Sequence, residues 1–310
     1  MSKQLVDIGT QTTAQLIENK IGHAVGINPI PKEELFTGGH NYSVGAITGG
    51  ENSTIAINFK KELYVLTNDT KKFFKMTKDH TCWDDEALIA PHPINIHETC
   101  VLVYDNPVTE KKEIHILGGY GYNSRAHYKW DGKNWSVASE LPYDFCGGKA
   151  IVFNDEIHIF GGGENHYSLS TDGYLNYHYK WDGSDWKEAS KPSFNMKGAT
   201  PVVFNNEIWL IGSVTSSDNR NVRSFSNGSW TNKTSIPTSY YGVTNASVIV
   251  FNETIHVVGG VDTSGNKIRW HITYTESSGW GNNTQIPPEA LCDSSNGLVE
   301  FDNNLWIIGS

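Results

Sequence analysis

The side chains best suited to recognising a ligand lie in and around residues 163–177, which mix tyrosines with acidic, amide and imidazole groups. With shorter neighbouring stretches, this region supplies ten candidate binding residues: Tyr122, Asn123, Arg125, Glu164, His166, Tyr167, Asp172, Tyr174, Asp218 and Arg220. Aromatic rings can cover the C–H faces of a sugar while polar groups bind its hydroxyls. Tyr and Arg also dominate protein interfaces. A glycan and a protein receptor therefore remain equal alternatives, beside solvated loops without a ligand.

Catalytic and metal chemistry find less support in the residue types and their spacing. The sequence contains no GxGxxG, P-loop, HExxH or GxSxG motif. The densest group of acidic and histidine residues, within residues 84–97, matches no metal-binding spacing. The four cysteines show no CxxC pairing, which favours buried thiols. We expect a protein that is not an enzyme and that has no catalytic residues, metal or cofactor.

The candidate loops follow a strand motif that recurs along the chain. Its clearest copy is residues 156–162, EIHIFGG, an apolar strand followed by glycines. Altered copies return at intervals of 43 to 51 residues, beginning at Glu62, Glu113, Glu207, Thr254 and Asn304. A period near 50 residues indicates a repeat architecture.

Each copy lies within a four-strand unit. An apolar strand ending in an aromatic residue precedes it, and two strands joined by an Asp-Gly turn follow it in residues 128–135 and 179–186. We name the strands A to D. Four strands per unit, closed radially, form a β-propeller. The B–C and D–A connections emerge on one face, where variable loops on a rigid scaffold usually carry binding.

The strand with its double glycine, an aromatic residue two strands later and the tryptophan of strand D resemble the kelch repeat. The resemblance covers residues 53–310 and implies an all-β, kelch-type β-propeller. Thr67 and Asn68 replace the glycines of the first unit, and Ser213 and Ser310 replace the second glycine of two others. Some kelch-type propellers are copper radical oxidases or sialic-acid epimerases. Neither composition nor spacing identifies the tyrosine–cysteine cross-link and ligands of the copper type.

Three histidines, His115, His158 and His256, share the centre of strand B, where other copies carry Tyr64, Trp209 and Trp306. Interchange of these residue types indicates a packing position between blades, suited to a flat ring with a polar edge. We therefore interpret these histidines as structural.

Residues 1–50 lack the repeat and are predicted to hold a helix and a linker. Thr12 and Gln15 fit a capping box, and Gly22 can end a helix of about nine residues. This segment serves either attachment to a larger assembly or closure of the propeller. The last unit stops after two strands, so we expect a strand within residues 41–47 to complete it, giving six blades. The alternative is five blades with an irregular cap.

The composition limits the partners. Charged residues are 19% of the chain and the net charge is −10, which disfavours nucleic acid because a phosphate backbone requires clustered Lys and Arg. No apolar run reaches the length of a membrane span, so no membrane insertion is expected. The N-terminus lacks the apolar core of a signal peptide, which predicts cytosolic synthesis.

These observations favour a non-catalytic recognition module that binds a surface glycan or a protein through the B–C/D–A face. The Asn-, Gly-, Tyr- and Trp-rich composition and short docking helix resemble kelch-type heads of phage tails or tail-like particles in a general way, which implies a virion or tail-like particle component. An intracellular kelch scaffold and a carbohydrate-active propeller enzyme are the alternatives.

Overall fold

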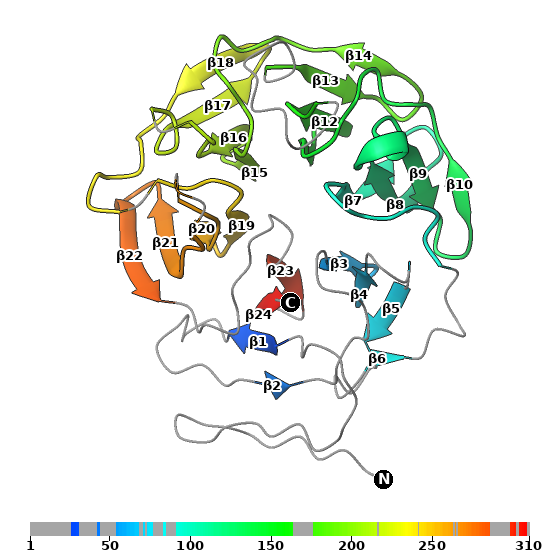
Figure 1. Ribbon diagram of the computed structural model, residues 1–310, viewed down its shortest axis with the longest axis horizontal. Helices are drawn as coiled ribbons and strands as arrows, with labels where there is room; N and C mark the ends of the chain where they lie inside the picture. Colours follow the sequence, from blue (N-terminus) through cyan, green and yellow to red (C-terminus); the bar gives the residue numbers. More distant parts are fainter. Residues whose placement is uncertain are drawn as a thin grey trace.

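The computed structural model describes residues 26–30, 42–43, 54–67, 71, 73–76, 83–84, 91–163, 176–215, 217–240, 242–262, 264, 266–285, 298–301 and 304–308. Its strands form four-stranded antiparallel sheets arranged as the blades of an all-β β-propeller (Figure 1). Five blades are contiguous in sequence, and a sixth sheet combines strands from both ends of the chain.

The contiguous blades follow one another around the ring, each in the order A to D. Blade 1 contains β3 (Thr54–Phe59), β4 (Glu62–Thr67), β5 (Phe73–Met76) and β6 (Trp83–Asp84). Blade 2 contains β7 (Cys100–Asn106), β8 (Lys111–Leu117), β9 (His127–Trp130) and β10 (Trp135–Val137). Blade 3 contains β11 (Lys149–Phe153), β12 (Glu156–Phe160), β13 (His178–Trp181) and β14 (Trp186–Glu188).

The other two contiguous blades keep the same plan. Blade 4 contains β15 (Thr200–Phe204), β16 (Glu207–Ile211), β17 (Val222–Ser226) and β18 (Ser229–Asn232). Blade 5 contains β19 (Ser247–Phe251), β20 (Thr254–Val258), β21 (Trp270–Thr275) and β22 (Gly279–Gln285).

The sixth sheet joins the two ends of the chain, in the order β2-β1-β24-β23. Its C-terminal strands are β23 (Leu298–Phe301) and β24 (Asn304–Ile308), and β1 (Gly26–Ile30) pairs with β24. The outermost strand, β2 (Tyr42–Ser43), lies within residues 41–47, which confirms the predicted closing strand. The chain places Pro29 and Ile30 in β1, where the sequence indicated a linker. The predicted helix near residues 12–21 lies outside the described residues.

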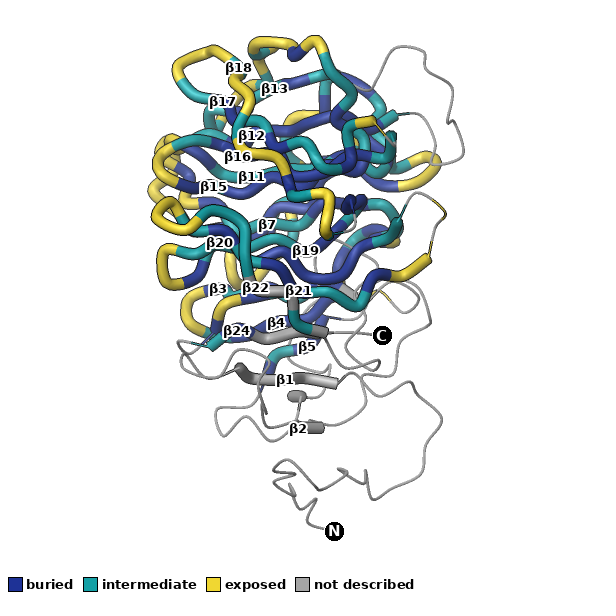
Figure 2. Tube along the Cα trace, turned by 90° about the vertical axis from the view of Figure 1, so that its left-hand side faces the viewer, coloured by how far each residue is buried: buried dark blue, intermediate teal, exposed yellow. Residues whose placement is uncertain are grey.

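The hydrophobic core lies between blades. The inner strands β3, β7, β11, β15, β19 and β23 contact one another in a closed ring around the centre of the propeller (Figure 1). Apolar side chains from each blade pack against the next: Tyr104 and Leu117 of blade 2 share a cluster with Ile159 and Trp181 of blade 3. Buried residues occupy the interior, and exposed residues concentrate at the connections (Figure 2). Recognition residues on those connections therefore stand on a rigid support.

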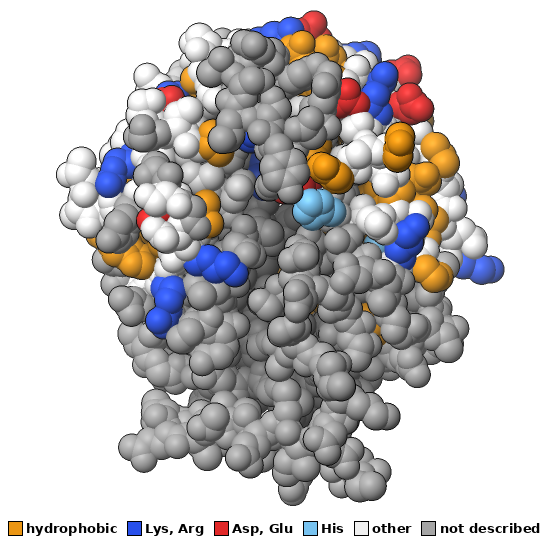
Figure 3. All heavy atoms as spheres, viewed as in Figure 1, with side chains coloured by type: hydrophobic (Ala, Val, Ile, Leu, Met, Phe, Trp, Pro, Cys, Tyr) orange, Lys and Arg blue, Asp and Glu red, His pale blue; other side chains and the backbone are white. Residues whose placement is uncertain are grey.

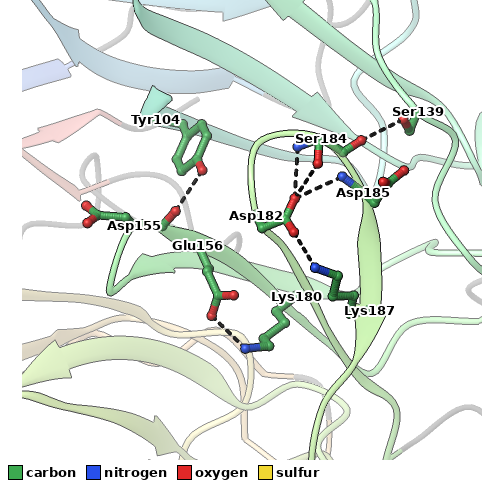
Figure 4. A network of polar contacts seen from close by, with 9 residues as sticks. All are labelled: Tyr104, Ser139, Asp155, Glu156, Lys180, Asp182, Ser184, Asp185 and Lys187. Atoms are coloured by element: carbon green, nitrogen blue, oxygen red, sulfur yellow. Dashed lines mark hydrogen bonds and ion pairs between the residues drawn. The ribbon is translucent and has the colours of Figure 1, made fainter. Parts of the chain in front are cut away.

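The hairpin face, which carries the A–B and C–D turns, repeats closely. The A–B turns at Asn154-Asp155 and Asn205-Asn206 have positive φ at both residues, as the sequence suggested for Asn and Asp. Asp182 accepts backbone hydrogen bonds from Ser184 and Asp185 and pairs with Lys187 (Figure 4). Ser139 donates to the carbonyl of Ser184 in the next blade.

Three blades bury a hydrogen-bonded histidine pair between strands B and C. Nδ1 of the first histidine lies 2.8–2.9 Å from Nε2 of the second, in the pairs His115–His127, His158–His178 and His256–His271. Each pair is almost fully buried. The His115 ring lies 5.2 Å from that of Trp181 in the next blade, which confirms the predicted packing role. Burial lowers the pKa of every one of these histidines.

Candidate functional site

The B–C loop of blade 2 presents two exposed tyrosines. It contains a single 3₁₀ turn, η2 (Gly121–Asn123), between β8 and β9. The Tyr122 side chain is fully exposed, and Tyr120 is 43% exposed. The Tyr120 ring meets the His97 ring edge-on, with 5.5 Å between the ring centroids. The backbone N–H of Tyr120 donates to the His97 carbonyl. Hydrophobic side chains gather over the β7–β10 blade on the right of this face (Figure 3).

The tyrosine loop is tied to the D–A connection of its own blade. Ser124 Oγ donates to Asp144 Oδ1 at 2.5 Å, and Arg125 Nε donates to the Leu141 carbonyl at 2.9 Å. Two backbone bonds add to these: Leu141 N–H donates to Arg125, and Phe145 N–H donates to Ser124. These four bonds hold the tyrosines of the loop on a fixed base. Arg125 therefore has a positioning role that its sequence context does not reveal.

The hydrogen bond from the Arg125 side chain to a carbonyl of the D–A connection, which we call a latch, recurs in two other blades. It starts there from the position that Arg125 occupies in blade 2. In blade 4, Arg220 Nη1 donates to the Pro237 carbonyl at 2.7 Å and to that of Tyr240. In blade 3, Asn176 Nδ2 donates to the Pro192 carbonyl at 3.2 Å. Arg220 thus repeats the structural contact that Arg125 makes in blade 2.

Asp218 is also committed to its own loop. Its carboxylate accepts from Thr215 Oγ1 at 3.0 Å, Asn221 Nδ2 at 2.6 Å and Arg223 Nη2 at 2.8 Å. The Arg223 hydrogen bond is the main cause of a lowered Asp218 pKa. With its oxygens occupied, Asp218 holds the loop in shape.

The structure thus sorts the ten sequence candidates. Glu164, His166, Tyr167, Asp172 and Tyr174 lie outside the described residues. Arg125, Asp218 and Arg220 are bound to their own loops. Tyr122, fully exposed, and Asn123, half-buried beside it, remain as surface groups that a ligand can reach.

Sequence reasoning missed a ring of left-handed residues at the loop-face end of the inner strands. One such residue stands two positions before strand A in four blades: Glu98, Gly147, Gly198 and Asn245, with φ of 57°, 67°, 72° and 53°. The Gly147 N–H donates to the Glu98 carbonyl at 3.0 Å, and the Asn245 N–H donates to the Gly198 carbonyl at 2.8 Å. We call these four residues the mouth ring.

The first residue of strand A forms a second repeated contact. Cys100 Sγ donates to the Gly148 carbonyl at 3.0 Å, and Thr200 Oγ1 donates to the Ala246 carbonyl at 2.8 Å. Each bond joins one blade to the next. Burial raises the pKa of the Cys100 thiol to about 11. This thiol is therefore protonated at neutral pH and suited to donating the bond.

Lys149 occupies that strand-start position in blade 3. It is half-buried beside the mouth ring. Burial lowers the pKa of its ammonium, while the charge of Glu98 acts in the opposite direction. The only sequence signal for the mouth ring was the column formed by Glu98, Gly147, Gly198 and Asn245 when the repeats are aligned.

Two further features concern the described part of the chain. There, no group of three or more His, Cys, Asp or Glu side chains converges in a way that could hold a metal ion. Within the same residues, no helix is both long enough and apolar enough to cross a membrane.

Comparisons with known proteins support the architecture. No protein-family model matches the chain, and no curated protein matches it. Among solved structures, that of YjhT is similar, with a TM-score of 0.64 and 17% sequence identity. The match covers 84% of this chain and 90% of YjhT. At this identity the likeness shows the fold alone, a β-propeller.

Proposed function

We propose that this β-propeller belongs to the kelch type and is a non-catalytic recognition module that binds a surface glycan through its B–C/D–A face. One observation carries the proposal: Tyr122 is fully exposed on a turn that four hydrogen bonds anchor to the propeller. An aromatic ring in that position adds little to folding. Because the loop is fixed in advance, binding loses little conformational entropy.

The neighbouring groups suit a sugar. The Tyr122 and Tyr120 rings offer faces for C–H groups, and Asn123 offers an amide. The Arg125 side chain is 49% exposed and that of Glu140 75% exposed, and Nη2 of the former lies 4.0 Å from Oε2 of the latter. Nε of Arg125 is committed to the Leu141 carbonyl, but the rest of its guanidinium and the Glu140 carboxylate are exposed and can exchange hydrogen bonds with hydroxyls. A protein receptor is the alternative ligand for the same surface, because tyrosine and arginine also serve as interface anchors.

The proposed setting is a receptor-binding head of a phage tail or tail-like particle. It rests on the general resemblance in composition described above. If it is right, antibodies against the propeller label the tips of purified particles in electron micrographs. Labelling confined to host cytosol would favour an intracellular scaffold instead.

The direct test is a glycan array probed with the wild-type chain, Tyr122→Ala and Val108→Ala. Val108 is the matched control, an exposed apolar residue on the hairpin face. We expect saturable binding that falls at least tenfold in Tyr122→Ala and is unchanged in Val108→Ala. Both variants should keep a free energy of unfolding within about 0.5 kcal/mol of wild type, because neither side chain is packed.

Equal binding by Tyr122→Ala and wild type would place the glycan elsewhere. A blank array, with saturable binding to one purified receptor protein that Tyr122→Ala abolishes, would replace the glycan with a protein ligand. Release of a cleaved or rearranged sugar by the wild-type chain would refute the non-catalytic assignment.

A further inference from the structure

The A–B turn of blade 1 departs from the repeat on the hairpin face. Its two residues, Lys60 and Lys61, have φ of 54° and 64°. Blades 3 and 4 fill the same turn with Asn154-Asp155 and Asn205-Asn206, which are residue types that tolerate left-handed backbone better than lysine does. The turn would therefore form more readily with asparagine. The lysine pair places positive charge on the hairpin face in spite of backbone strain.

This lysine turn lies beside the C–D turn of blade 2, which carries a further lysine. A Cβ on Gly132 would lie 3.4 Å from Lys60 Nζ, and Lys133 is the next residue. The Asp131 carboxylate of that turn accepts the backbone N–H of Lys133. Lys60, Lys61 and Lys133 are exposed and form no ion pair within the described part of the chain, whereas seven other lysines do. They form a local group of unpaired cations.

Unpaired carboxylates occupy the same face in blade 3. Asp155, in the A–B turn, and Asp185, in the C–D turn, are both exposed. Neither carboxylate has a partner among the residues drawn in Figure 4, whereas Asp182 pairs with Lys187 at 2.5 Å. Blade 3 therefore presents free negative charge on the hairpin face, and blade 1 presents free positive charge.

An apolar tip stands between the two charged groups. The A–B hairpin of blade 2 has seven residues in each strand, against four to six in the other blades, and Val108 at its tip is 63% exposed. A Cβ on Gly183 would lie 3.0 Å from Val108 Cγ2, so the tip lies against the C–D turn of blade 3. The exposed hairpin turns line the left-hand side of Figure 2. Their order across blades 1 to 3 is lysines, apolar tip, aspartates.

That order is complementary to itself. When a second copy is turned over about a two-fold axis through blade 2, blade 1 of each copy faces blade 3 of the other. Lysines then meet aspartates on both sides of the axis, and the two Val108 side chains lie near it. A two-fold interface requires a surface of this kind, which matches its own copy. An apolar centre with a polar rim is also the usual anatomy of a protein interface.

We propose that the hairpin faces of two copies pair through blades 1 to 3 and form a two-fold dimer. Lys60 and Lys61 of each copy lie opposite Asp155 and Asp185 of the other. The two loop faces then point away from one another, so a flat glycan surface meets only one of them. Because the attraction comes from exposed charges, salt screens it and weakens the dimer.

The repeat provides variants that exchange the two turns. Lys60→Asn with Lys61→Asp gives blade 1 the turn of blade 3, and Asn154→Lys with Asp155→Lys gives blade 3 the turn of blade 1. Both sequences already form this turn in the chain, so each variant should fold, which thermal denaturation checks. Glu140→Lys, on the loop face, is the control for a change of charge elsewhere. Sedimentation velocity over a series of protein concentrations measures dimerisation at about 50 mM and about 500 mM NaCl.

We expect wild type and Glu140→Lys to dimerise at low salt, with a dissociation constant roughly tenfold higher or more at high salt. Each exchange variant alone should dimerise at least tenfold more weakly than wild type. An equimolar mixture of the two exchange variants should recover the dimer. In the mixed dimer the two altered turns face one another with opposite charge, and the two native turns do the same. Misfolding of either variant would not be repaired by mixing.

A wild-type chain that stays monomeric at low salt would overturn the dimer, and so would a dimer that both exchange variants keep. If both variants are folded and their mixture stays monomeric, blade 1 does not face blade 3. A monomeric wild type that binds poly-L-glutamate through Lys60 and Lys61 would replace the second copy with an acidic partner. None of these results changes glycan binding on a flat array, so the dimer and the recognition face are tested separately.

Discussion

Blades 3 and 4 fill the same buried position with opposite chemistry. In blade 3, His158 on strand B bonds to His178 at the start of strand C. The corresponding residues of blade 4 are Trp209 and Val222, both within the core. The residues at the two positions vary together, since every described blade with histidine at the first position also has histidine at the second. The position accepts either two histidines that hydrogen-bond to one another or a tryptophan with a valine, and a mixture would leave the inter-ring hydrogen bond unmade.

The difference should make the histidine blades sensitive to acid. The Ser190 carbonyl can only accept, so His178 donates through Nδ1 and receives a hydrogen bond from His158 at Nε2. This arrangement requires a neutral His178 ring, and burial lowers the pKa to about 3 for His158 and about 4 for His178. Protonation of His178 at Nε2 removes the acceptor and breaks the bond, and protonation of both rings places two positive charges together.

The largest predicted effect is therefore acid destabilisation. The histidines of the unfolded chain become protonated below about pH 6.5, whereas the buried pairs of the folded protein stay neutral until about pH 4. Stability is fully present above pH 6.5 and is lost as the pH falls below it, by up to about 1.4 kcal/mol per pH unit for each histidine. If only three of these six histidines contribute, stability falls by up to roughly 6 kcal/mol between pH 6.5 and pH 5. Urea unfolding at pH 7.5, 6 and 5 measures this loss, and a flat profile would contradict it.

A second prediction compares glycines that end strand B in neighbouring blades. Gly118 and Gly161 have similar φ, 65° and 61°. A Cβ on Gly118 would lie 2.2 Å from the Phe145 carbonyl oxygen, whereas one on Gly161 meets nothing closer than 3.8 Å. Gly118→Ala should cost about 4 kcal/mol and Gly161→Ala about 1 kcal/mol, the latter from backbone strain alone. Equal losses in urea unfolding would mean that the clash relaxes freely.

Breaking one histidine pair should cost less than the clash at Gly118. His178→Val copies the strand C residue of blade 4 but leaves the His158 N–H without an acceptor, at a cost of about 2 kcal/mol. His158→Gln with native His178 is the control, because an amide can still donate. The measurement is the urea midpoint at pH 7.5. If His178→Val proves neutral, the pair does not act as a unit.

The smallest predicted stability effect concerns the latches. Arg220→Ala removes bonds to two carbonyls, and Arg125→Ala removes one bond from a half-exposed side chain. We expect losses of about 2 and about 1 kcal/mol respectively. Thermal denaturation ranks the two variants. The reverse order would mean that the blade 2 loop depends more on its latch than the hydrogen bonds indicate.

The fold could be predicted from the sequence more completely than the site because the same strand pattern recurs in each blade. Six aligned copies of strand B fixed the strands, and Asn-Asp and Asp-Gly turns fixed the hairpins. The closing strand β2 followed from an incomplete last unit. Strand β1 was missed because Pro29 and the glycine at its start are typical of a linker, and only pairing with β24 makes the segment a strand.

The site was harder to predict because its contacts join distant parts of the chain. Arg125 and Arg220 were predicted to bind a ligand, yet their partners are carbonyls 16 to 20 residues away. The amino-acid sequence around these arginines does not indicate partners so far away. The left-handed backbone of Glu98, at φ 57°, was missed because glutamate is not a residue type that indicates it. Comparing the blades with one another, position by position, would have identified Glu98 and Lys149 as departures.

The central claim is that recognition occurs on the loop face, and hydrogen–deuterium exchange tests it most directly. Backbone exchange would be compared with and without the oligosaccharide that binds most strongly on the array. We predict protection in residues 118–126 and 138–148, and none in the hairpin turns at residues 131–134 and 182–185. Protection confined to the hairpin turns would contradict the account and move the ligand to the opposite face.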